Sequence, residues 1–152
     1  MRNGDASVQI LAGWQKQDDG SYDDPTLGKA TSNVLISASE TTLLDTAALG
    51  RPENLDLVRA LGLEPGLVRA DLVAAAIRKV DGIQFYDFDL ALPARTCDAE
   101  LATACLPSLV VLLSCGIRAG KLHVVRVDAT ADQWKRAGTA LRLLRTSFKV
   151  DG

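Results

Sequence analysis

The residue types best suited to chemistry in this 152-residue chain are clustered carboxylates. Four aspartates flank a Gly-Ser-Tyr turn near the N-terminus: Asp18, Asp19, Asp23 and Asp24. Ca²⁺ accepts several carboxylate oxygens in a flexible geometry, so this cluster is a candidate cation site. The ligand alternation of an EF-hand loop is missing, however, and runs of charge usually face solvent. A solvated acidic hairpin is therefore the stronger interpretation.

A second pair of carboxylates, Asp87 and Asp89, lies in the alternating segment from Gln84 to Leu90. On a strand both side chains project from the same face, about 7 Å apart, which is a separation that an acid/base pair can have. We expect them instead on an exposed face of a half-covered sheet. There they would pair with arginines of neighbouring strands, such as Arg118 or Arg126.

Histidine and cysteine offer little further chemistry. His123 is the only histidine, which excludes a His-rich metal site, and because it lies within a predicted strand we interpret it as a structural or surface imidazole and not as a general base. Cys97, Cys105 and Cys115 form no Cys-x-x-Cys pair, which argues against a zinc site. Cys115 is expected in the core, while Cys97 and Cys105 could equally form a disulfide or remain free thiols. Glycine-rich phosphate motifs and a nucleophile elbow are absent.

The elements that must position these residues are mostly strands. Alternation and turn signals predict a hairpin through Asp81-Gly82 and a second hairpin through Ala119-Gly120. Leu67 to Lys79 also matches a helix, and the downstream turn decides for a strand. The predicted strands are Val8 to Trp14, Thr31 to Ser39, Leu67 to Lys79, Gln84 to Leu90, Leu109 to Arg118 and Lys121 to Ala129, with a short helix between Pro52 and Gly62. This order predicts an α+β fold, a central antiparallel β-sheet flanked by helices in an α/β/α sandwich.

A C-terminal helix has the clearest signals. Thr130 and Gln133 have the spacing of a capping box, which predicts the start of the helix. An apolar stripe follows at helical spacing: Trp134, Ala137, Leu141, Leu144 and Phe148. Five cations occupy the rest of the segment: Lys135, Arg136, Arg142, Arg145 and Lys149. We expect these cations to form a basic surface without internal partners, suited to docking an acidic protein.

Composition sets the wider limits. The chain has the length of one domain, 1–152, with 47% hydrophobic residues and a formal net charge of −2, so it shows no overall attraction to nucleic acid. Acidic residues dominate up to Gly66, and the basic residues gather after Val68. No apolar run approaches the roughly 20 residues of a membrane span. The N-terminus lacks the pattern of a signal or transit peptide, so we expect either a cytosolic protein or a chain that begins after processing.

Several segments, taken in order, resemble the PsbP family of lumenal extrinsic proteins of oxygenic photosynthesis. They are an early apolar segment ending in Trp14, Ala30 to Val34, the GRPENL stretch from Gly50 to Leu55, VDGIQFYDFDL from Val80 to Leu90, AGKLHVVRVDAT from Ala119 to Thr130, and the helix that ends in Ser147 and Phe148. The C-terminal block is the most specific of these, and the resemblance extends over essentially the whole chain.

The resemblance implies a non-enzymatic protein, peripheral to the membrane in the chloroplast thylakoid lumen. Its implied partners are membrane-embedded photosystem subunits and other extrinsic proteins, and photosystem II is the first choice. There it would support the oxygen-evolving centre, with Ca²⁺ as the implied ion. The alternatives are an assembly factor or accessory subunit of photosystem I or of the chloroplast NADH dehydrogenase-like complex. A weaker alternative is a small cytosolic binding or metal-binding module that uses the aspartate cluster.

Overall fold

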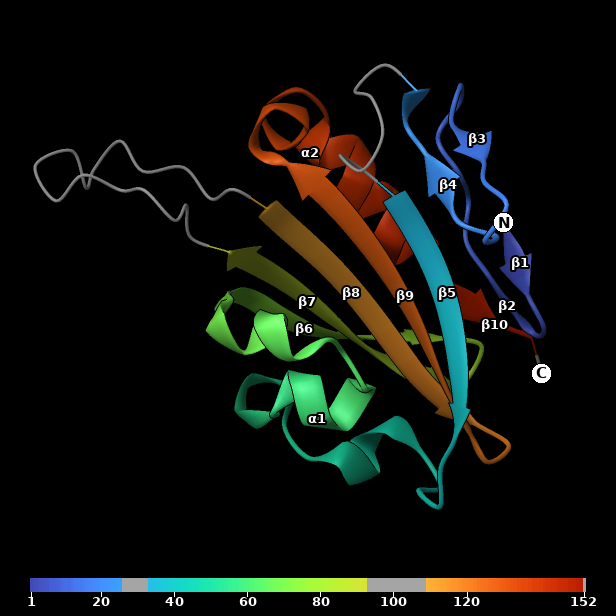
Figure 1. The fold of residues 1–152 in the computed structure, drawn as a ribbon. Coiled ribbons are helices and arrows are strands. Elements are labelled where there is room, and N and C mark those ends of the chain that lie inside the picture. Colours follow the sequence, from blue (N-terminus) through green and yellow to red (C-terminus); the bar gives the residue numbers. More distant parts are fainter. Residues whose placement is uncertain (26–32, 93–108, 152) are drawn as a thin grey trace, which may run out of the picture.

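The structure, a computed structural model, describes residues 1–25, 33–92 and 109–151. Its centre is a twisted antiparallel sheet with the strand order β3-β4-β5-β9-β8-β7-β6 (Figure 1). The long strands are β5 (Asn33–Glu40), β6 (Asp71–Val80), β7 (Ile83–Leu92), β8 (Leu109–Arg118) and β9 (Lys121–Thr130). Two short strands, β3 (Gln15–Lys16) and β4 (Tyr22–Asp23), complete the sheet beyond β5.

Both predicted hairpins are confirmed. The β6–β7 hairpin closes with Val80 opposite Ile83, and the β8–β9 hairpin closes with Arg118 opposite Lys121. Each two-residue turn has positive φ at both positions, with values of 51° and 81° at Asp81 and Gly82 and of 51° and 77° at Ala119 and Gly120. Such turns match the right-handed twist of the strands that they join.

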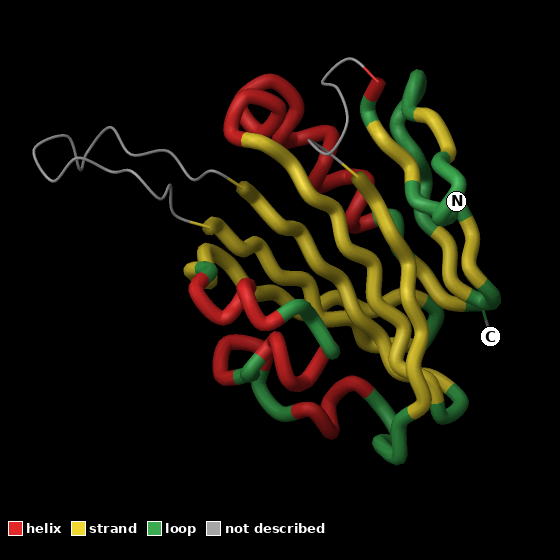
Figure 2. Tube along the Cα trace, in the orientation of Figure 1, coloured by secondary structure: helices red, strands yellow, loops and turns green. Residues whose placement is uncertain are grey.

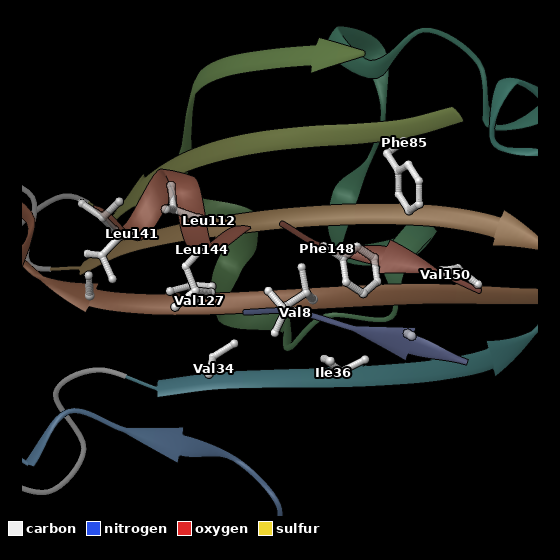
Figure 3. Close-up of a cluster of buried hydrophobic side chains, with 14 of the residues drawn as sticks. Val8, Val34, Ile36, Phe85, Leu112, Val127, Leu141, Leu144, Phe148 and Val150 are labelled. Atoms are coloured by element: carbon white, nitrogen blue, oxygen red, sulfur yellow. The ribbon is translucent and has the colours of Figure 1, made fainter. Parts of the chain in front are cut away.

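One face of the sheet is covered by helix α2 (Ala131–Thr146) and a small second sheet. The small sheet has the order β1-β2-β10 and consists of β1 (Arg2–Asn3), β2 (Ala6–Ser7) and β10 (Lys149–Val150). Apolar side chains from both layers meet in one buried cluster, in which the rings of Phe85 and Phe148 lie edge to face, 5.7 Å apart (Figure 3). We call this side the α2 face.

The opposite face is covered by short helices (Figure 2). They are the 3₁₀ helices η2 (Thr46–Leu49), η3 (Pro52–Asn54) and η4 (Pro65–Arg69) and the α-helix α1 (Leu57–Leu61). Two buried hydroxyl groups attach this layer: the Thr46 hydroxyl donates to the carbonyl of Gln84, and the Tyr86 hydroxyl donates to the carbonyl of Gly50. The predicted α+β sandwich is therefore confirmed, with helices on both faces of an antiparallel sheet.

Three predicted elements differ most from what the structure shows. Val8 to Trp14 is not a strand, because this apolar run packs irregularly on the α2 face, with Val8 buried in the cluster. The helix expected between Pro52 and Gly62 is divided into η3 and α1, since Asp56 caps a new helix start by accepting from the Arg59 amide. The strand expected from Leu67 starts only at Asp71, after η4. Cys97 and Cys105 lie outside the described residues, as does the first part of the strand expected from Thr31.

Candidate docking face on helix α2

Helix α2 begins where the sequence predicts, although only half of the capping box forms. The Thr130 hydroxyl accepts a hydrogen bond of 3.3 Å from the backbone amide of Gln133, as an N-cap side chain should. The Gln133 side chain does not reach back to Thr130. Its Nε2 donates instead to Asp24 Oδ2 at 3.1 Å, which ties the first turn of the helix to the segment after β4.

The predicted apolar stripe is confirmed as the buried side of α2. Leu141, Leu144 and Phe148 lie in the core of the α2 face, and Trp134 and Ala137 pack partly buried against it. Ala137 has non-helical backbone angles, with φ −131° and ψ 15°, so the helix is kinked at this point. The kink separates a first segment that contains Trp134 from a second segment that is fixed in the core.

Arg145 does not belong to an exposed basic surface, and this part of the prediction is wrong. The residue is only 7% exposed and lies between α2 and the sheet. Its Nη1 donates to Asp89 Oδ1 at 2.7 Å and to the carbonyl of Phe88 at 3.0 Å. An ion pair at this depth must be well satisfied to offset the loss of hydration. Arg145 therefore anchors the helix on β7.

Arg142 is shared between the interior and the surface, so the expectation that it has no internal partner is also wrong. Its guanidinium lies 3.3 Å from Asp89 Oδ2 and 4.8 Å from the centre of the Trp134 ring. About half of the Arg142 side chain, 51%, stays exposed. This stacked arrangement connects the two sides of the kink, because Trp134 precedes it and Arg142 follows it.

The remaining cations do face solvent. Lys135 and Arg136 are exposed on the first half of α2, and within the described residues they take part in no ion pair. They line an open groove of about 550 Å³ together with Trp134, Arg142 and Leu143, whose side chain is 67% exposed. Lys149 is also exposed, but it lies on β10, beyond the end of the helix. The candidate docking face is therefore smaller than the sequence suggests, and it combines charge with apolar surface.

Asp87 and Asp89 occupy the α2 face and not an exposed face, so that prediction is wrong. Both are buried, at 7% and 6% exposed, because α2 and Phe148, which follows it, lie on the side of β7 that carries them. Arginines do neutralise them, although not those expected. Arg78 Nε donates to Asp87 Oδ2 at 2.9 Å, while Arg145 and Arg142 both form ion pairs with Asp89. These carboxylates stabilise the fold. Because they are buried and ion-paired, they are unsuited to proton transfer with a substrate.

Arg78 is a residue that the sequence interpretation did not single out. Its Nη2 donates to the Ser114 hydroxyl at 2.9 Å and to the Phe148 carbonyl at 3.0 Å, and its guanidinium lies 4.6 Å from the centre of the Phe85 ring. The Ser114 hydroxyl in turn donates to Asp87. Arg78 thus links β6, β7, β8 and Phe148, which lies between α2 and β10, through one partly buried guanidinium.

Arg118 and Arg126, the arginines expected beside Asp87 and Asp89, lie elsewhere. Arg126 pairs with Asp128 at 2.7 Å and with Glu64 at 2.9 Å, on the face of the sheet that the short helices cover in part. Burial raises the pKa of Asp128, which the Arg126 guanidinium opposes. This pair connects β9 to the segment before η4 and is structural.

The aspartate cluster does not assemble into a cation site within the residues that the structure describes. Asp19 Oδ1 accepts from both the amide and the hydroxyl of Ser21, which lowers the pKa of the Asp19 carboxyl. Asp24 accepts from Gln133. No group of three or more His, Cys, Asp or Glu side chains in residues 1–25, 33–92 and 109–151 is placed to hold a metal ion. The four aspartates, among them Asp18 and Asp23, form the acidic hairpin that we favoured.

His123 and Cys115 are buried structural residues. His123 lies on β9 and is 3% exposed, and its Nδ1 has no hydrogen-bond partner in the described residues. Burial lowers the pKa of His123 below its ordinary value, helped by Lys121 and opposed by Asp5. Burial raises the pKa of the Cys115 thiol to about 12. Neither group is poised for acid-base or nucleophilic work near neutral pH.

The buried imidazole makes the stability of the protein depend on pH. The folded-state pKa of His123 is depressed. The unfolded chain therefore takes up a proton as the pH falls through about 6.5, while the folded protein resists it. The free energy of unfolding should decrease on acidification, by at most about 1.4 kcal/mol per pH unit from this group. Urea unfolding at a series of pH values measures this slope, and His123→Gln should flatten it. Identical pH profiles of the two proteins would contradict the prediction.

None of the described helices combines the length and the apolar character that crossing a membrane requires. No protein-family model matches the sequence, and no curated protein matches it. Solved structures do match. PsbP of the cyanobacterium Synechocystis superposes with a TM-score of 0.63 at 16% identity, covering 96% of this chain and 86% of that chain. LpqN of Mycobacterium tuberculosis, described as involved in cell envelope biogenesis, gives a TM-score of 0.53 at 11% identity, covering 97% of this chain and 83% of that chain.

These likenesses show the fold, and the predicted PsbP-like fold is confirmed. These two proteins, a cyanobacterial PsbP and a protein described as involved in cell envelope biogenesis, share the fold under different descriptions, so the fold alone does not select a role. Role has to be argued from the surfaces of this chain.

Proposed function

We propose that this protein is a non-catalytic extrinsic subunit that docks on the lumenal face of a thylakoid photosynthetic complex, with photosystem II as the first candidate. The fold shared with cyanobacterial PsbP over 96% of the chain is compatible with this role, and the observation that carries the proposal is the pair of exposed cations on α2, Lys135 and Arg136, which take part in no ion pair within the described residues. The sequence resemblance to the PsbP family, strongest in the C-terminal strand and helix, points the same way. As part of this proposal, the protein would help the complex to retain Ca²⁺, the ion that the family resemblance implies.

The chemistry of the docking surface follows from the residues that α2 leaves exposed. Lys135 and Arg136 have no ion-pair partner in the described part of the chain, and Leu143 is 67% exposed beside them. A matching partner surface would offer carboxylates around an apolar contact. Because exposed charge pairs are screened by salt, attachment should weaken as the ionic strength rises.

Reversal of the two exposed charges should weaken membrane attachment. In Lys135→Glu/Arg136→Glu, two attractions become repulsions, and we expect about tenfold weaker binding to isolated thylakoid membranes at low salt, which corresponds to about 1.4 kcal/mol. The measurement is a sedimentation assay with added protein at several salt concentrations. The wild type should detach as salt rises, and the variant should show a shallower salt dependence.

A matched control is available on the other face of the sheet. Arg51 and Arg59 are exposed cations of the short-helix layer, and Arg51→Glu/Arg59→Glu makes the same change in net charge. If both double variants lost binding equally, net charge and not the α2 surface would govern attachment. Binding of the wild type that resists high salt would also contradict the proposal.

The complex can be identified directly. Cross-linking in thylakoids, followed by solubilisation and co-purification, should recover subunits of photosystem II. Recovery of photosystem I or of the NADH dehydrogenase-like complex would assign the protein to that complex as an accessory subunit or assembly factor. Recovery of no thylakoid complex would overturn the proposal.

A further inference from the structure

Strand β6 forms an open edge of the central sheet (Figure 1). It runs for 10 residues and pairs with β7 on one side only. On its outer side, alternate backbone amide and carbonyl groups meet no partner within the described residues. Such a row of unpaired groups is a template for another strand.

The side chains of β6 leave this edge unprotected. Leu72 to Ile77 is an unbroken apolar run, in which Leu72, Val73 and Ile77 are 41%, 63% and 55% exposed. Soluble proteins usually blunt such an edge with charges, proline or a very short strand. The only irregularity here is the register shift between Leu72 and Ala74, near the start of the strand.

The apolar surface continues beyond the strand. Val68 on η4 is 72% exposed, and it lines, with Leu57, Leu67 and Leu72, a groove of about 160 Å³ between the short helices and the sheet. Contiguous apolar surface of this kind marks an interaction site more often than chance exposure. The edge and the groove together offer both backbone and side-chain contacts.

The order of charges along β6 favours a second copy of the same strand. Asp71 begins the strand and Lys79 lies near its end, and Arg78 is held internally by Asp87. Antiparallel pairing of two copies brings Asp71 of one near Lys79 of the other at both ends, whereas parallel pairing would align like charges. Ala74, Ala75 and Ala76 occupy the middle, where two strands related by a twofold axis would approach each other most closely.

We propose that β6 pairs antiparallel with β6 of a second copy, which joins two seven-stranded sheets into one continuous sheet in a symmetric dimer. The contact uses the same strand of both copies, so it closes at two chains. It leaves α2 and its groove free, because these lie on one face of the sheet and not at its edge.

The test is sedimentation velocity of the full chain from micromolar to near-millimolar concentration. The wild type should pass from monomer to dimer. Val73→Lys/Ile77→Lys places two cations on the edge at positions that are already exposed, and dimerisation should weaken at least about tenfold. Leu44→Lys/Leu143→Lys is the matched control, since Leu44 and Leu143 are 91% and 67% exposed and lie outside β6, and it should dimerise like the wild type. Circular dichroism checks that all three proteins fold.

Hydrogen exchange locates the contact. Amides of β6 that point away from β7 should exchange more slowly in concentrated than in dilute wild-type protein, and this difference should vanish in the double variant. A wild type that stays monomeric throughout would overturn the proposal, as would a dimer that the double variant leaves intact. Growth beyond two chains, or protection of β6 only when thylakoid membranes are added, would overturn it too, because the edge would then have a different occupant.

Discussion

Asp89→Ala should destabilise the folded protein by about 3 to 5 kcal/mol, the usual cost of leaving a buried charge without its partner. Asp89 is 6% exposed, and its carboxylate forms ion pairs with the guanidinium groups of Arg142 and Arg145. Arg145, itself 7% exposed, would lose its carboxylate and keep only the carbonyls of Phe88 and Leu113 as acceptors. Arg142 would lose its link to the sheet and could turn fully to solvent.

Urea unfolding of wild type and variant at neutral pH measures this loss. Asp18→Ala is a matched control, because Asp18 is exposed, and it should change the free energy of unfolding by less than about 0.5 kcal/mol. In Asp89→Ala/Arg145→Met the stranded charge is gone, so stability should recover in part. A loss of less than about 1 kcal/mol in Asp89→Ala would contradict the prediction, because the Arg145 guanidinium would then be stabilised without its carboxylate.

The strands of the central sheet could be predicted because their signals are local. The limits of β8 agree with the prediction, and β9 extends it by one residue, since β8 is a continuous apolar run and a two-residue turn with glycine in its second position joins it to β9. The start of α2 was predictable for the same reason, from a cap and a stripe within one short segment. Local patterns therefore suffice for these two strands and the start of the closing helix, whereas the start of β6 and the short strands β3 and β4 carry no such pattern and were not predicted.

The charged contacts beneath α2 could not be read from spacing within one element. Arg145 and Asp89 are 56 residues apart, and Arg78 and Ser114 are 36 residues apart. One signal was nevertheless present. Position 145 follows Leu141 by four residues and precedes Phe148 by three, so it lies on the buried stripe and not opposite it. A cation at a stripe position predicts a buried acid on the facing strand.

The prediction of a strand in the N-terminal segment was wrong for a different physical reason. Val8 to Trp14 is apolar because it covers the core of the α2 face, and not because it pairs in a sheet. An apolar run reports burial, whereas strand formation also needs a neighbour with free backbone groups. Ala6–Ser7 and Gln15–Lys16, on either side of that run, find such neighbours, and within the run Val8 exchanges backbone hydrogen bonds with Met1 alone.

The buried arginines change which residues can act in docking. Of the five cations expected at the surface, Arg145 is an internal anchor and Arg142 is divided between Asp89 and the Trp134 ring. Lys135 and Arg136 remain as the exposed pair on the helix. The segment before the kink therefore carries the charge that a partner can meet, while the segment after the kink fixes the helix to the sheet.

Arg78→Met should also destabilise the protein by about 3 to 5 kcal/mol, because it leaves Asp87 buried without a cation. Three groups lose a donor at once: Asp87, which keeps the Ser114 hydroxyl as a donor, the Ser114 hydroxyl oxygen and the Phe148 carbonyl. Methionine keeps much of the apolar contact with Phe85, so the loss reports mainly on the charge. Arg59→Met, at an exposed position of α1, is the control and should change little.

The second variant separates charge from packing. In Arg78→Met/Asp87→Asn the buried carboxylate becomes a neutral amide, and most of the lost stability should return, as measured by urea unfolding. Hydrogen exchange shows which part of the sheet the substitution destabilises. Arg78 is the one polar side chain of β6 that reaches the interior among the contacts described, so the amides of the β6–β7 ladder should open first in Arg78→Met. If stability stayed low in the double variant, the guanidinium would act through packing against Phe85, and charge compensation would not be the cause.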